Sequence, residues 1–524
     1  MHSCIFKELP QHDRHRKYFL TFIGIMKRSA YPDLAILSGV VLLLFYPLFY
    51  THYFYTDEIV QLTHYRKGTN FHMFAEQGRY LTDRLFQSLF SAIDTIGQIT
   101  RLRLISLLGW MVCIPVWYTI LTRVCRKEEL PPFLPFFTVL YLIVCPPFCV
   151  SVSWASCMEL FIANTSGLVA GYALYSQIRF VPVPGTTHKK MELPARGVVL
   201  TLLFGVISLF TYQNGFGCFL LPFLLQAIAK KEWSRSIVAA IGMYFFTYLL
   251  YYMLFKWQLH FWQTGASTRT GFAAEPLSKI LFFLGRPLAT AFHFTWIVNE
   301  RSLAGKVFYA LVFVAWLLLN LFTRRPGSFP SRLRYLAGIF CLLILIYLPS
   351  LIVKENYASN RTLLALDMTI FLLVFTTLLQ WVRMEKNQLI MANLLGIFLV
   401  ANAWYNFRYQ FLGPVKKEYD LVRNYMETGI HSGITNVTFI RPTQDLFGRK
   451  YGVNISWDEF GVPSTYPGWV PEDFVRQVVF EKTGDRAAAD KLVITNWPDK
   501  QTWLASRPSP GENTFTVDVE SIMR

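Results

Sequence analysis

The chain is poor in charge. Asp, Glu, Lys and Arg make up only 16% of its 524 residues, against about a quarter in an average soluble domain. Hydrophobic residues supply 53% and aromatic residues 17%. A chain of this length and composition has more apolar side chain than a soluble core can bury. The composition excludes a disordered chain, a coiled coil and a disulfide-stapled miniprotein, and it predicts an α-helical polytopic membrane protein.

The sequence also lacks the short motifs with which soluble enzymes bind nucleotides and metals. It has no P-loop, no GxGxxG segment after a strand, no HExxH and no GxSxG. Its eight cysteines include no CxxC pair, and most lie in apolar runs, where cysteine packs as a small hydrophobe. We therefore expect no metal and no cofactor. We expect no nucleic acid partner either, because the excess of basic residues lies between apolar runs.

Long uncharged runs predict about eleven membrane spans, because a spanning helix needs about 20 largely apolar residues. The pair within 197–229 is short for two spans and long for one, and the turn Gln213-Asn214-Gly215 favours a tight hairpin. Residues 279–298 contain Arg286, Pro287 and His293, so we expect a helix lying in the outer interface. The expected spans are residues 34–56, 104–122, 133–151, 160–178, 197–212, 215–229, 237–255, 304–323, 335–350, 362–382 and 387–404.

The distribution of charge orients the chain in the membrane. Residues 405–524 have a net charge of −1, so residues 1–404 carry +18. Basic residues flank the first span on its N-terminal side and recur in every second loop, which predicts a cytoplasmic N-terminal segment, 1–33. The bundle 34–404 then has its long loops, 55–103 and 256–303, on the external side. The odd number of spans places the C-terminal part outside as well.

The C-terminal part, residues 405–524, differs in kind from the bundle. Its pattern predicts helices at 414–430 and 471–482 and short buried strands at 436–440 and 491–495, which together indicate a small soluble α/β domain. Such a domain could recognise an acceptor by stacking sugars on aromatic rings, or it could only cap the bundle. The candidate stacking residues are Trp457, Tyr466, Trp469 and Trp503.

The richest external polar cluster follows the first span. Asp57 and Glu58 are adjacent carboxylates at an expected helix end, and the segment Gly78-Arg79-Tyr80 follows them. A carboxylate could act as a general base and a neighbouring arginine could bind a phosphate. An ordinary interfacial anchor explains the cluster equally well. His64 and Arg84 lie in the same loop.

A second cluster, residues 354–361, leads into the tenth expected span. Arg361 could snorkel to the interface, or its planar guanidinium could grip an anionic lipid head group. Tyr357 and Asn360 stand beside it. Asp367 lies inside the span, about 9 Å further along the helix axis. For this carboxylate we expect a structural hydrogen bond in the bundle interior.

These features together resemble the GT-C glycosyltransferases. Within them, the chain is most similar to the Gtr-type O-antigen glucosyltransferases, which modify bacterial lipopolysaccharide. That group typically has an acidic residue in the first external loop and then a Gly-Arg-aromatic segment, which Asp57 and the GRYLTDRL stretch, 78–85, match. The SNRTLLAL stretch, 359–366, resembles a later loop whose arginine faces the donor phosphate. The resemblance covers about residues 30–404 and does not include the C-terminal domain.

The resemblance implies a multi-pass protein of the bacterial inner membrane with a periplasmic C-terminal domain. Its donor would be a glucose-like hexose on polyprenyl phosphate, and its acceptor an external glycan or lipid-linked glycan such as O-antigen. Asp57, or secondly Glu58, would be the base of an inverting displacement, while Arg361 and Arg79 would bind the leaving phosphate. Membrane lipids would surround the bundle. Further substrate contacts would come from His64, Arg84, Tyr357, Asn360, Arg286 and His293.

Two other functional classes remain open from the residues alone. A transporter or flippase for lipid-linked sugars would place charged residues deep in several spans and often contains internal repeats, whereas here only Asp367 is deep and no repeat is visible. A polymerase or ligase of lipid-linked glycans would depend on external Arg and His, with less need for a carboxylate after the first span. Loss of transfer on removing the Asp57 carboxylate would favour the transferase over both.

Overall fold

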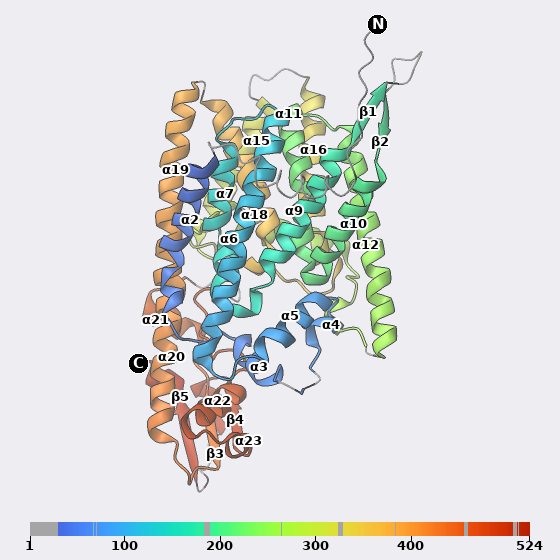
Figure 1. The fold of residues 1–524 in the computed structure, drawn as a ribbon. Helices are drawn as coiled ribbons and strands as arrows, with labels where there is room; N and C mark the ends of the chain where they lie inside the picture. The colour runs from blue at the N-terminus through green and yellow to red at the C-terminus, as the bar shows by residue number, and fades with distance from the viewer. Residues whose placement is uncertain are drawn as a thin grey trace.

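Long helices packed side by side form most of the molecule (Figure 1). The computed structural model describes residues 30–524 except 67, 70, 183–188, 264, 323–327, 383, 455–458, 507–510 and 512, so most of the predicted segment 1–33 lies outside the described residues. Within the described residues, eight helices are long and apolar enough to cross a membrane, or nine if one bent pair forms a single span. The chain is therefore an α-helical polytopic membrane protein.

The candidate spans follow most of the uncharged runs. Helices α7 (Leu134–Val144) and α8 (Pro146–Ser153) form the bent pair, with an angle of 50° between them. The break falls at Pro146, whose backbone has no N–H to continue the hydrogen bonding of α7. The eight long helices are α2 (Tyr31–Phe45) with η2 (Tyr46–Phe49), α6 (Ile96–Lys127), η3 (Ala155–Cys157) with α9 (Leu160–Gln177), α12 (Arg235–Trp262), α15 (Leu303–Phe322), α16 (Phe329–Ile346), α18 (Leu364–Trp381) and α19 (Glu385–Tyr405) with its continuation to Gly429.

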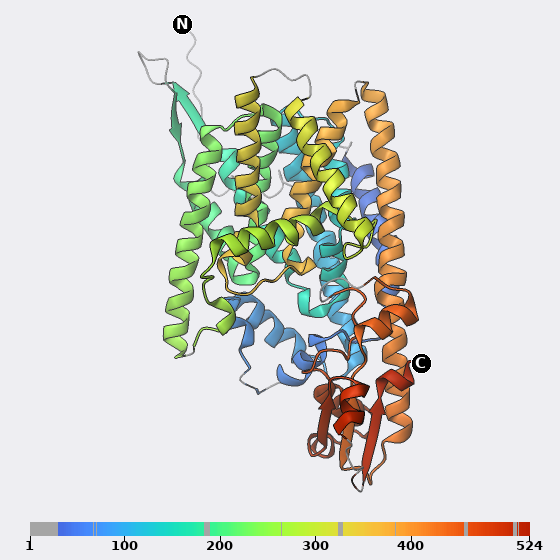
Figure 2. The same cartoon turned by 180° about the vertical axis from the view of Figure 1, so that it is seen from behind.

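The predicted number of eleven spans is not confirmed, and the difference lies in the doubtful region 197–229. Helix α10 (Ala195–Thr211) has only 17 residues. After it come a 3-10 segment, η4 (Gln213–Leu220), and a ten-residue helix, α11 (Leu221–Lys230). The predicted interfacial helix 279–298 is two short helices, α13 (Pro276–Gly285) and α14 (Pro287–Phe292), which lie across the long helices (Figure 2).

Small residues allow η4 to pack directly on α9. A Cβ atom on Gly167 would lie 2.5 Å from the carbonyl oxygen of Gly215, and one on Gly171 would collide with the backbone of Phe219. Glycine therefore lets the two backbones approach each other, as small residues do between membrane helices. This packing fixes the position of Gln213, at the start of η4, next to the candidate site described below.

The two ends of the bundle differ. Helices α3 (Asp57–His64), α4 (Met73–Glu76) and α5 (Tyr80–Phe90) lie at the same end as the C-terminal sheet, which we call the domain end (Figure 1). The opposite end, the hairpin end, has the antiparallel strands β1 (Arg179–Pro182) and β2 (Lys189–Glu192).

The C-terminal part contains a small parallel sheet with helices around it. The sheet has the order β4-β3-β5, with all three strands parallel. The strand expected at 436–440 is present, the one expected at 491–495 begins two residues later, and the third strand was not predicted. The elements are α20 (Gly413–Gly429), β3 (Asn436–Ile440), α21 (Gln444–Tyr451), α22 (Pro471–Thr483), α23 (Arg486–Asp490), β4 (Val493–Trp497), α24 (Lys500–Ser506), β5 (Thr514–Asp518) and α25 (Val519–Ile522).

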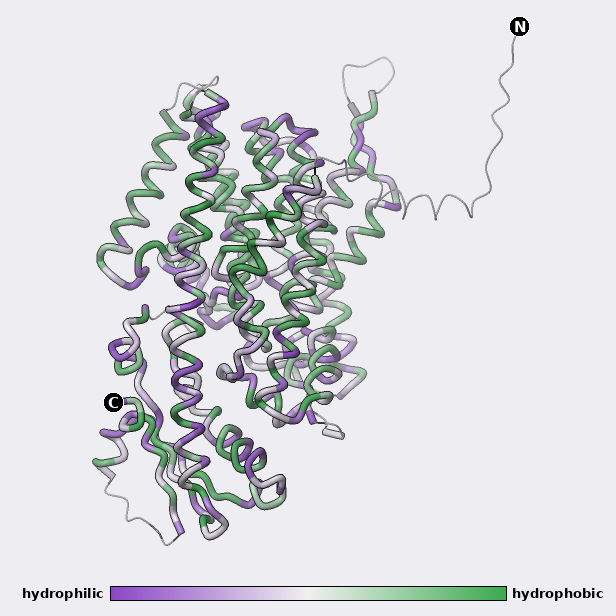
Figure 3. Tube along the Cα trace, turned by 60° about the vertical axis from the view of Figure 1, so that its left-hand side comes forward, coloured by the Kyte–Doolittle hydropathy of each residue, from purple (hydrophilic) through white to green (hydrophobic). Residues whose placement is uncertain are grey.

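No break separates the last span from this domain. Helix α19, the π-helical segment η7 (Asn406–Leu412) and α20 form one helix of 45 residues, Glu385–Gly429. The expected boundary near residue 405 therefore falls inside a helix rather than in a linker. Figure 3 shows that the colouring is mostly hydrophobic over the bundle and more hydrophilic where this helix enters the C-terminal domain.

Candidate active site

A pocket of about 670 Å³ lies at the domain end, between helices α3 and α4, helix α12 and the segment 348–362. This volume is within the usual range for small-molecule sites. Charged and polar side chains line one part of it: Asp57, Gln61, Gln77, Arg79, Ser156, Gln213, Asn214, Lys256, Arg269, Ser350, Glu355, Tyr357, Arg361 and Thr362.

The other part of the pocket wall is apolar and faces outward from the bundle. Phe245, Leu249 and Tyr252 of the candidate span α12 line the pocket and are 48%, 55% and 42% exposed. Phe272 and Ile352 are also exposed and complete this side. Exposed apolar side chains on a membrane-spanning helix face lipid, so the pocket combines a polar end with a side that is open towards the bilayer.

Asp57 is the first residue of α3 and borders the pocket. The residue before it, Thr56, has a φ of 39°, a backbone conformation that non-glycine residues rarely adopt. Strained backbone of this kind is concentrated at functional sites. The indole N–H of Trp469, from the C-terminal domain, donates a hydrogen bond of 2.8 Å to Oδ1 of Asp57. The C-terminal domain therefore contacts the predicted base directly.

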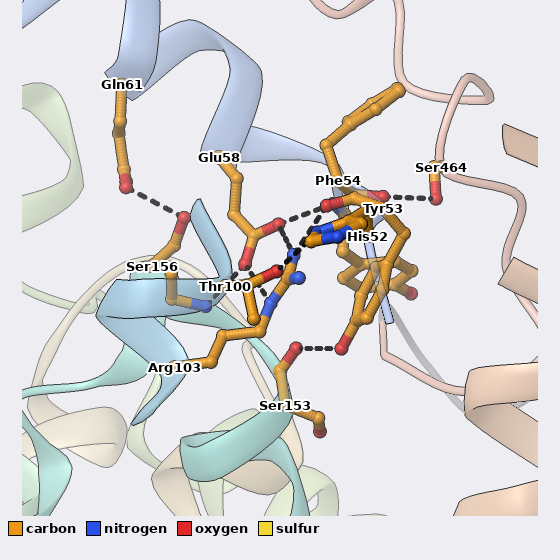
Figure 4. A network of polar contacts seen from close by, with 12 residues as sticks. His52, Tyr53, Phe54, Glu58, Gln61, Thr100, Arg103, Ser153, Ser156 and Ser464 are labelled. Carbon is orange, nitrogen blue, oxygen red and sulfur yellow. Dashed lines mark hydrogen bonds and ion pairs between the residues drawn. The ribbon is translucent and has the colours of Figure 1, made fainter. Parts of the chain in front are cut away.

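Glu58, the second candidate base, is not among the residues that line the pocket, and its polar contacts are with Arg103 and neighbouring backbone groups (Figure 4). Its side chain is fully buried and forms an ion pair with Arg103, which is also fully buried. The backbone N–H groups of Tyr55 and Ala155 donate to the same carboxylate, and Arg103 donates to the carbonyl oxygen of Tyr53 at 3.1 Å. Buried charges are stable only when paired in this way. The geometry therefore favours a structural role for Glu58 over the catalytic one.

Arg79 is held at the pocket by neutral groups. Gly78, just before it, has a φ of +78°, and a Cβ atom there would collide with the hydroxyl of Tyr251, which donates to the Gly78 carbonyl oxygen at 3.1 Å. The Nε atom of Arg79 donates to Gln213 at 3.2 Å, and the guanidinium lies 4.2 Å from the ring centroid of Tyr212. Arg79 also interacts electrostatically with the carboxylate of Glu159.

Arg361 lies on another side of the same pocket. It belongs to the 3-10 turn η6 (Asn360–Thr362), just before span α18. Its guanidinium carbon is 4.7 Å from the ring centroid of Trp154 and 5.1 Å from that of Tyr357, and it donates to the Tyr357 hydroxyl. The structure thus brings together three predicted site residues, Arg361, Arg79 and Asp57, that are up to 304 positions apart in the chain.

Glu459, from the C-terminal domain, holds the turn that contains Arg361. Its fully buried carboxylate accepts hydrogen bonds from the Ser359 hydroxyl and from the Asn360 side-chain amide at 3.0 Å. It also accepts from the backbone N–H groups of Asn360 at 3.1 Å and Arg361 at 3.3 Å. Sequence reasoning missed this residue, because the contact joins segments 100 positions apart and leaves no local pattern. Asn360 is therefore a member of this support rather than a lining residue.

Glu159 is a second residue that sequence reasoning missed. It is fully buried at the start of α9 and interacts electrostatically with both Arg79 and Arg361. Its Oε2 atom has no hydrogen-bond partner among the described residues. A carboxylate placed near two arginines can interact favourably with both of them. The sequence did contain a signal for this residue, because Glu159 is a carboxylate in the short loop between the expected spans 133–151 and 160–178.

Besides Asn360, four more of the predicted substrate contacts do not line the pocket. His64 forms an ion pair with Asp473 of α22, with 3.4 Å between Nε2 and Oδ2, and this hydrogen bond raises the pKa of His64. The guanidinium of Arg84 is 5.1 Å from the ring centroid of Trp262. Both residues fasten neighbouring elements at the domain end.

The other two lie further away, around helices α13 and α14. Arg286 stands between the two helices. His293 is buried, and its two ring nitrogens face carbonyl oxygens of Ala289 at 2.6 Å and Gly305 at 3.0 Å. The buried position of His293 indicates a structural role for it. Asp367 is buried in α18, but its Oδ1 atom lacks the expected hydrogen bond within the described part of the chain.

The arrangement can perform acid–base chemistry beside a bound anion. Asp57 borders the pocket together with Arg79 and Arg361, while the other two oppositely charged lining residues, Arg269 and Glu355, form an ion pair with each other at 3.5 Å. The lipid-facing wall can take an apolar chain. Among the described residues no group of three or more His, Cys, Asp or Glu side chains is placed to hold a metal ion. No protein-family model matches the chain, and no curated protein matches it in sequence.

Proposed function

We propose that the protein is a membrane glycosyltransferase of the GT-C type. It transfers a sugar, a glucose-like hexose, from a polyprenyl-phosphate donor to an external glycan or lipid-linked acceptor such as O-antigen. The observation that supports this most directly is the shared pocket of Asp57, Arg79 and Arg361, which has one apolar side open to lipid.

The two parts of the pocket match the two parts of such a donor. A phosphate binds well to guanidinium groups, whose planar forks donate two parallel hydrogen bonds. The polyprenyl chain is apolar and would leave the pocket along the exposed side chains of α12, such as Phe245 and Leu249. A nucleotide-linked sugar would have no use for this lipid-facing wall.

The proposed reaction is a single displacement. Asp57 accepts the proton of an acceptor hydroxyl, and the hydroxyl oxygen forms a bond to the anomeric carbon of the donor sugar. The bond between that carbon and the phosphate oxygen breaks, and polyprenyl phosphate leaves with the electron pair. Arg361 and Arg79 stabilise the negative charge that develops on the phosphate. Attack opposite the leaving group inverts the configuration of the anomeric carbon.

We also propose that the hairpin end is cytoplasmic and the domain end external. Basic residues are concentrated in the connections at the hairpin end, including Arg179 and Lys190 of the β1–β2 hairpin. In a bacterial inner membrane the pocket and the C-terminal domain would then be periplasmic. Nucleotide sugars are absent there, which agrees with a lipid-linked donor.

A transfer assay with Asp57→Asn tests this function. The full-length protein in nanodiscs receives polyprenyl-phosphate hexose with a radiolabelled sugar and a panel of glycan acceptors, and labelled product is counted. The Asn side chain keeps the shape but lacks the basicity, so we expect the rate to fall by about 100-fold or more. Glu76→Gln is the matched control, since Glu76 lies at the same end outside the pocket and this variant should keep its activity.

Two results would overturn the proposal. Turnover close to that of the unmodified protein in a well-folded Asp57→Asn variant would exclude the base. Movement of the labelled lipid across vesicle bilayers without any transfer would instead identify a flippase.

A further inference from the structure

A loop of the C-terminal domain presents an exposed aromatic ring beside the proposed base. This loop, residues 463–469, ends at Trp469, whose indole N–H is bound to Asp57 while its side chain is 61% exposed. Tyr466 of the same loop is also exposed. Tryptophan is usually well buried, so an exposed ring that is nevertheless fixed through its one polar atom indicates a binding surface.

The beginning of the loop is fixed to two other elements. The buried carboxylate of Glu418, in α20, accepts hydrogen bonds from the backbone N–H groups of Ser464 at 2.7 Å and Thr465 at 3.1 Å. It also accepts from the Thr465 hydroxyl at 2.6 Å. The Ser464 hydroxyl donates to the carbonyl oxygen of Phe54 at 3.1 Å, three residues before Asp57. The loop is thereby tied to the segment that leads into the proposed base (Figure 4).

The end of the loop is held by the sheet. Arg441 donates to the carbonyl oxygen of Tyr466 at 2.7 Å, and Asn496 of β4 donates to that of Gly468 at 2.7 Å. Because hydrogen bonds hold both ends, the ring of Trp469 has a defined position next to Asp57. A preorganised aromatic surface binds a ligand with a smaller loss of entropy than a mobile one.

We propose that the ring of Trp469 is the acceptor subsite and binds a neutral pyranose of the acceptor glycan. The proposal rests on the transferase function proposed above. The C–H groups of one face of a pyranose pack on the electron-rich face of an aromatic ring, and its hydroxyls then point outward from the ring edge. A sugar stacked on Trp469 therefore presents hydroxyls near the carboxylate to which the same indole is bound.

The surroundings of the loop favour a neutral glycan over a charged ligand. The nearby Arg441 is occupied by the backbone carbonyl groups of Tyr466 and Trp497, and the C-terminal part as a whole has a net charge of −1. The acceptor would reach Asp57 from the aqueous side, across the C-terminal domain. The donor would enter from the lipid side, along α12. Separate entrances allow both substrates to be bound at the same time.

Binding and kinetic measurements on two substitutions test this subsite. The full-length protein in nanodiscs is titrated with a panel of lipid-free, neutral O-antigen oligosaccharides, and transfer is measured against acceptor and donor concentration separately. Trp469→Ala removes the stacking face, so oligosaccharide affinity should fall and the acceptor KM should rise by about tenfold or more, with the donor KM unchanged. Trp469→Phe keeps a face and loses the N–H, so it should lower kcat while changing the acceptor KM less than threefold.

Leu504→Ala is the control, since it removes an exposed apolar side chain from α24 of the same domain, and it should leave the oligosaccharide affinity, both KM values and kcat unchanged. An unchanged acceptor KM in a folded Trp469→Ala variant would overturn the proposal and leave Trp469 as a residue that only orients Asp57. Release of the variant's C-terminal domain from the lipid surface, measured by quenching with brominated lipids, would identify the ring as a membrane anchor and would also overturn it. If Asp57→Asn abolishes transfer while the Trp469 variants keep their activity and acceptor KM, the transferase function is supported and only the subsite proposal fails. The two proposals can therefore fail separately.

Discussion

Replacing Glu459 by Gln tests whether the C-terminal domain supports the donor side of the site. The carboxylate accepts four hydrogen bonds from residues 359–361, whereas an amide has one acceptor oxygen and one N–H₂ group. In the more favourable of its two orientations, the Gln side chain places its amide oxygen where it still accepts from both Asn360 donors. The N–H₂ group then faces the Ser359 hydroxyl, which can rotate to accept, and the Arg361 backbone N–H, which cannot.

The size of the effect follows from these contacts. A hydrogen bond to a charged group contributes about 1 kcal/mol more than a neutral one, so the two retained N–H bonds together lose about 2 kcal/mol. The stranded N–H of Arg361 adds about 1 kcal/mol. If this whole loss of about 3 kcal/mol weakens the contact between Arg361 and the donor phosphate, donor binding becomes about 100-fold weaker, because 1.4 kcal/mol is a factor of ten. Relaxation of the turn reduces it, so we expect donor KM to rise by between 10- and 100-fold.

The assay compares donor KM, acceptor KM and thermal stability of the purified protein. Glu472→Gln is the matched control, because this exposed carboxylate of the same domain only pairs with Arg476 one helical turn away and such pairs contribute little. Combining Glu459→Gln with Arg361→Ala tests the route. If Glu459 acts through Arg361, the second substitution adds little to the first. Fully additive effects, or lower stability with an unchanged donor KM, would refute the reasoning.

Two further predictions concern single contacts. Arg361→Lys keeps the charge but lacks the planar fork, so we expect normal yield with donor affinity reduced by about tenfold; a silent Lys variant would show that Arg361 only anchors the chain. The hydrogen bond to Asp473 raises the pKa of His64 above its ordinary 6.5, so the contact contributes stability that is fully present below pH 6.5 and is lost as pH rises through the higher folded pKa. The melting temperature of the unmodified protein should therefore fall towards that of His64→Gln between pH 6 and 8, and an equal gap at both pH values would contradict this.

The sequence predicted the helical membrane bundle but not the conformation of every apolar run. Hydropathy identifies residues that avoid water, and it does so equally for side chains that face lipid and for those that face other helices. Segment η4 is almost entirely buried, has a 3-10 conformation and packs against Gly167 and Gly171 of α9. Its apolar pattern is that of a membrane span, so only the packing reveals the difference.

The sequence predicted only part of the candidate site, because contacts between distant segments decide which side chains face the pocket. Asp57 and Glu58 are neighbours in the chain, but successive residues of a helix point about 100° apart, and only one of them can face the pocket. Arg103 draws Glu58 into the interior from a helix 45 positions away. Glu459 and Trp469 reach the site from a domain whose own pattern contains no catalytic motif. The functional roles of all these residues stay predictions.

The continuous helix Glu385–Gly429 makes the spacing of its residues a geometric constraint on the site. A helix turns by about 100° and rises about 1.5 Å per residue, so one residue inserted into 406–412 would swing the C-terminal domain around the helix axis while hardly lifting it. Glu459 and Trp469 would then move away from Arg361 and Asp57 in the same step. Seven added residues would nearly restore the direction but lift the domain by about 10 Å. Changes of length in this segment are therefore far more restricted than changes of side chain. The π-helical turn at 406–412 already contains more residues than an α-helical turn would.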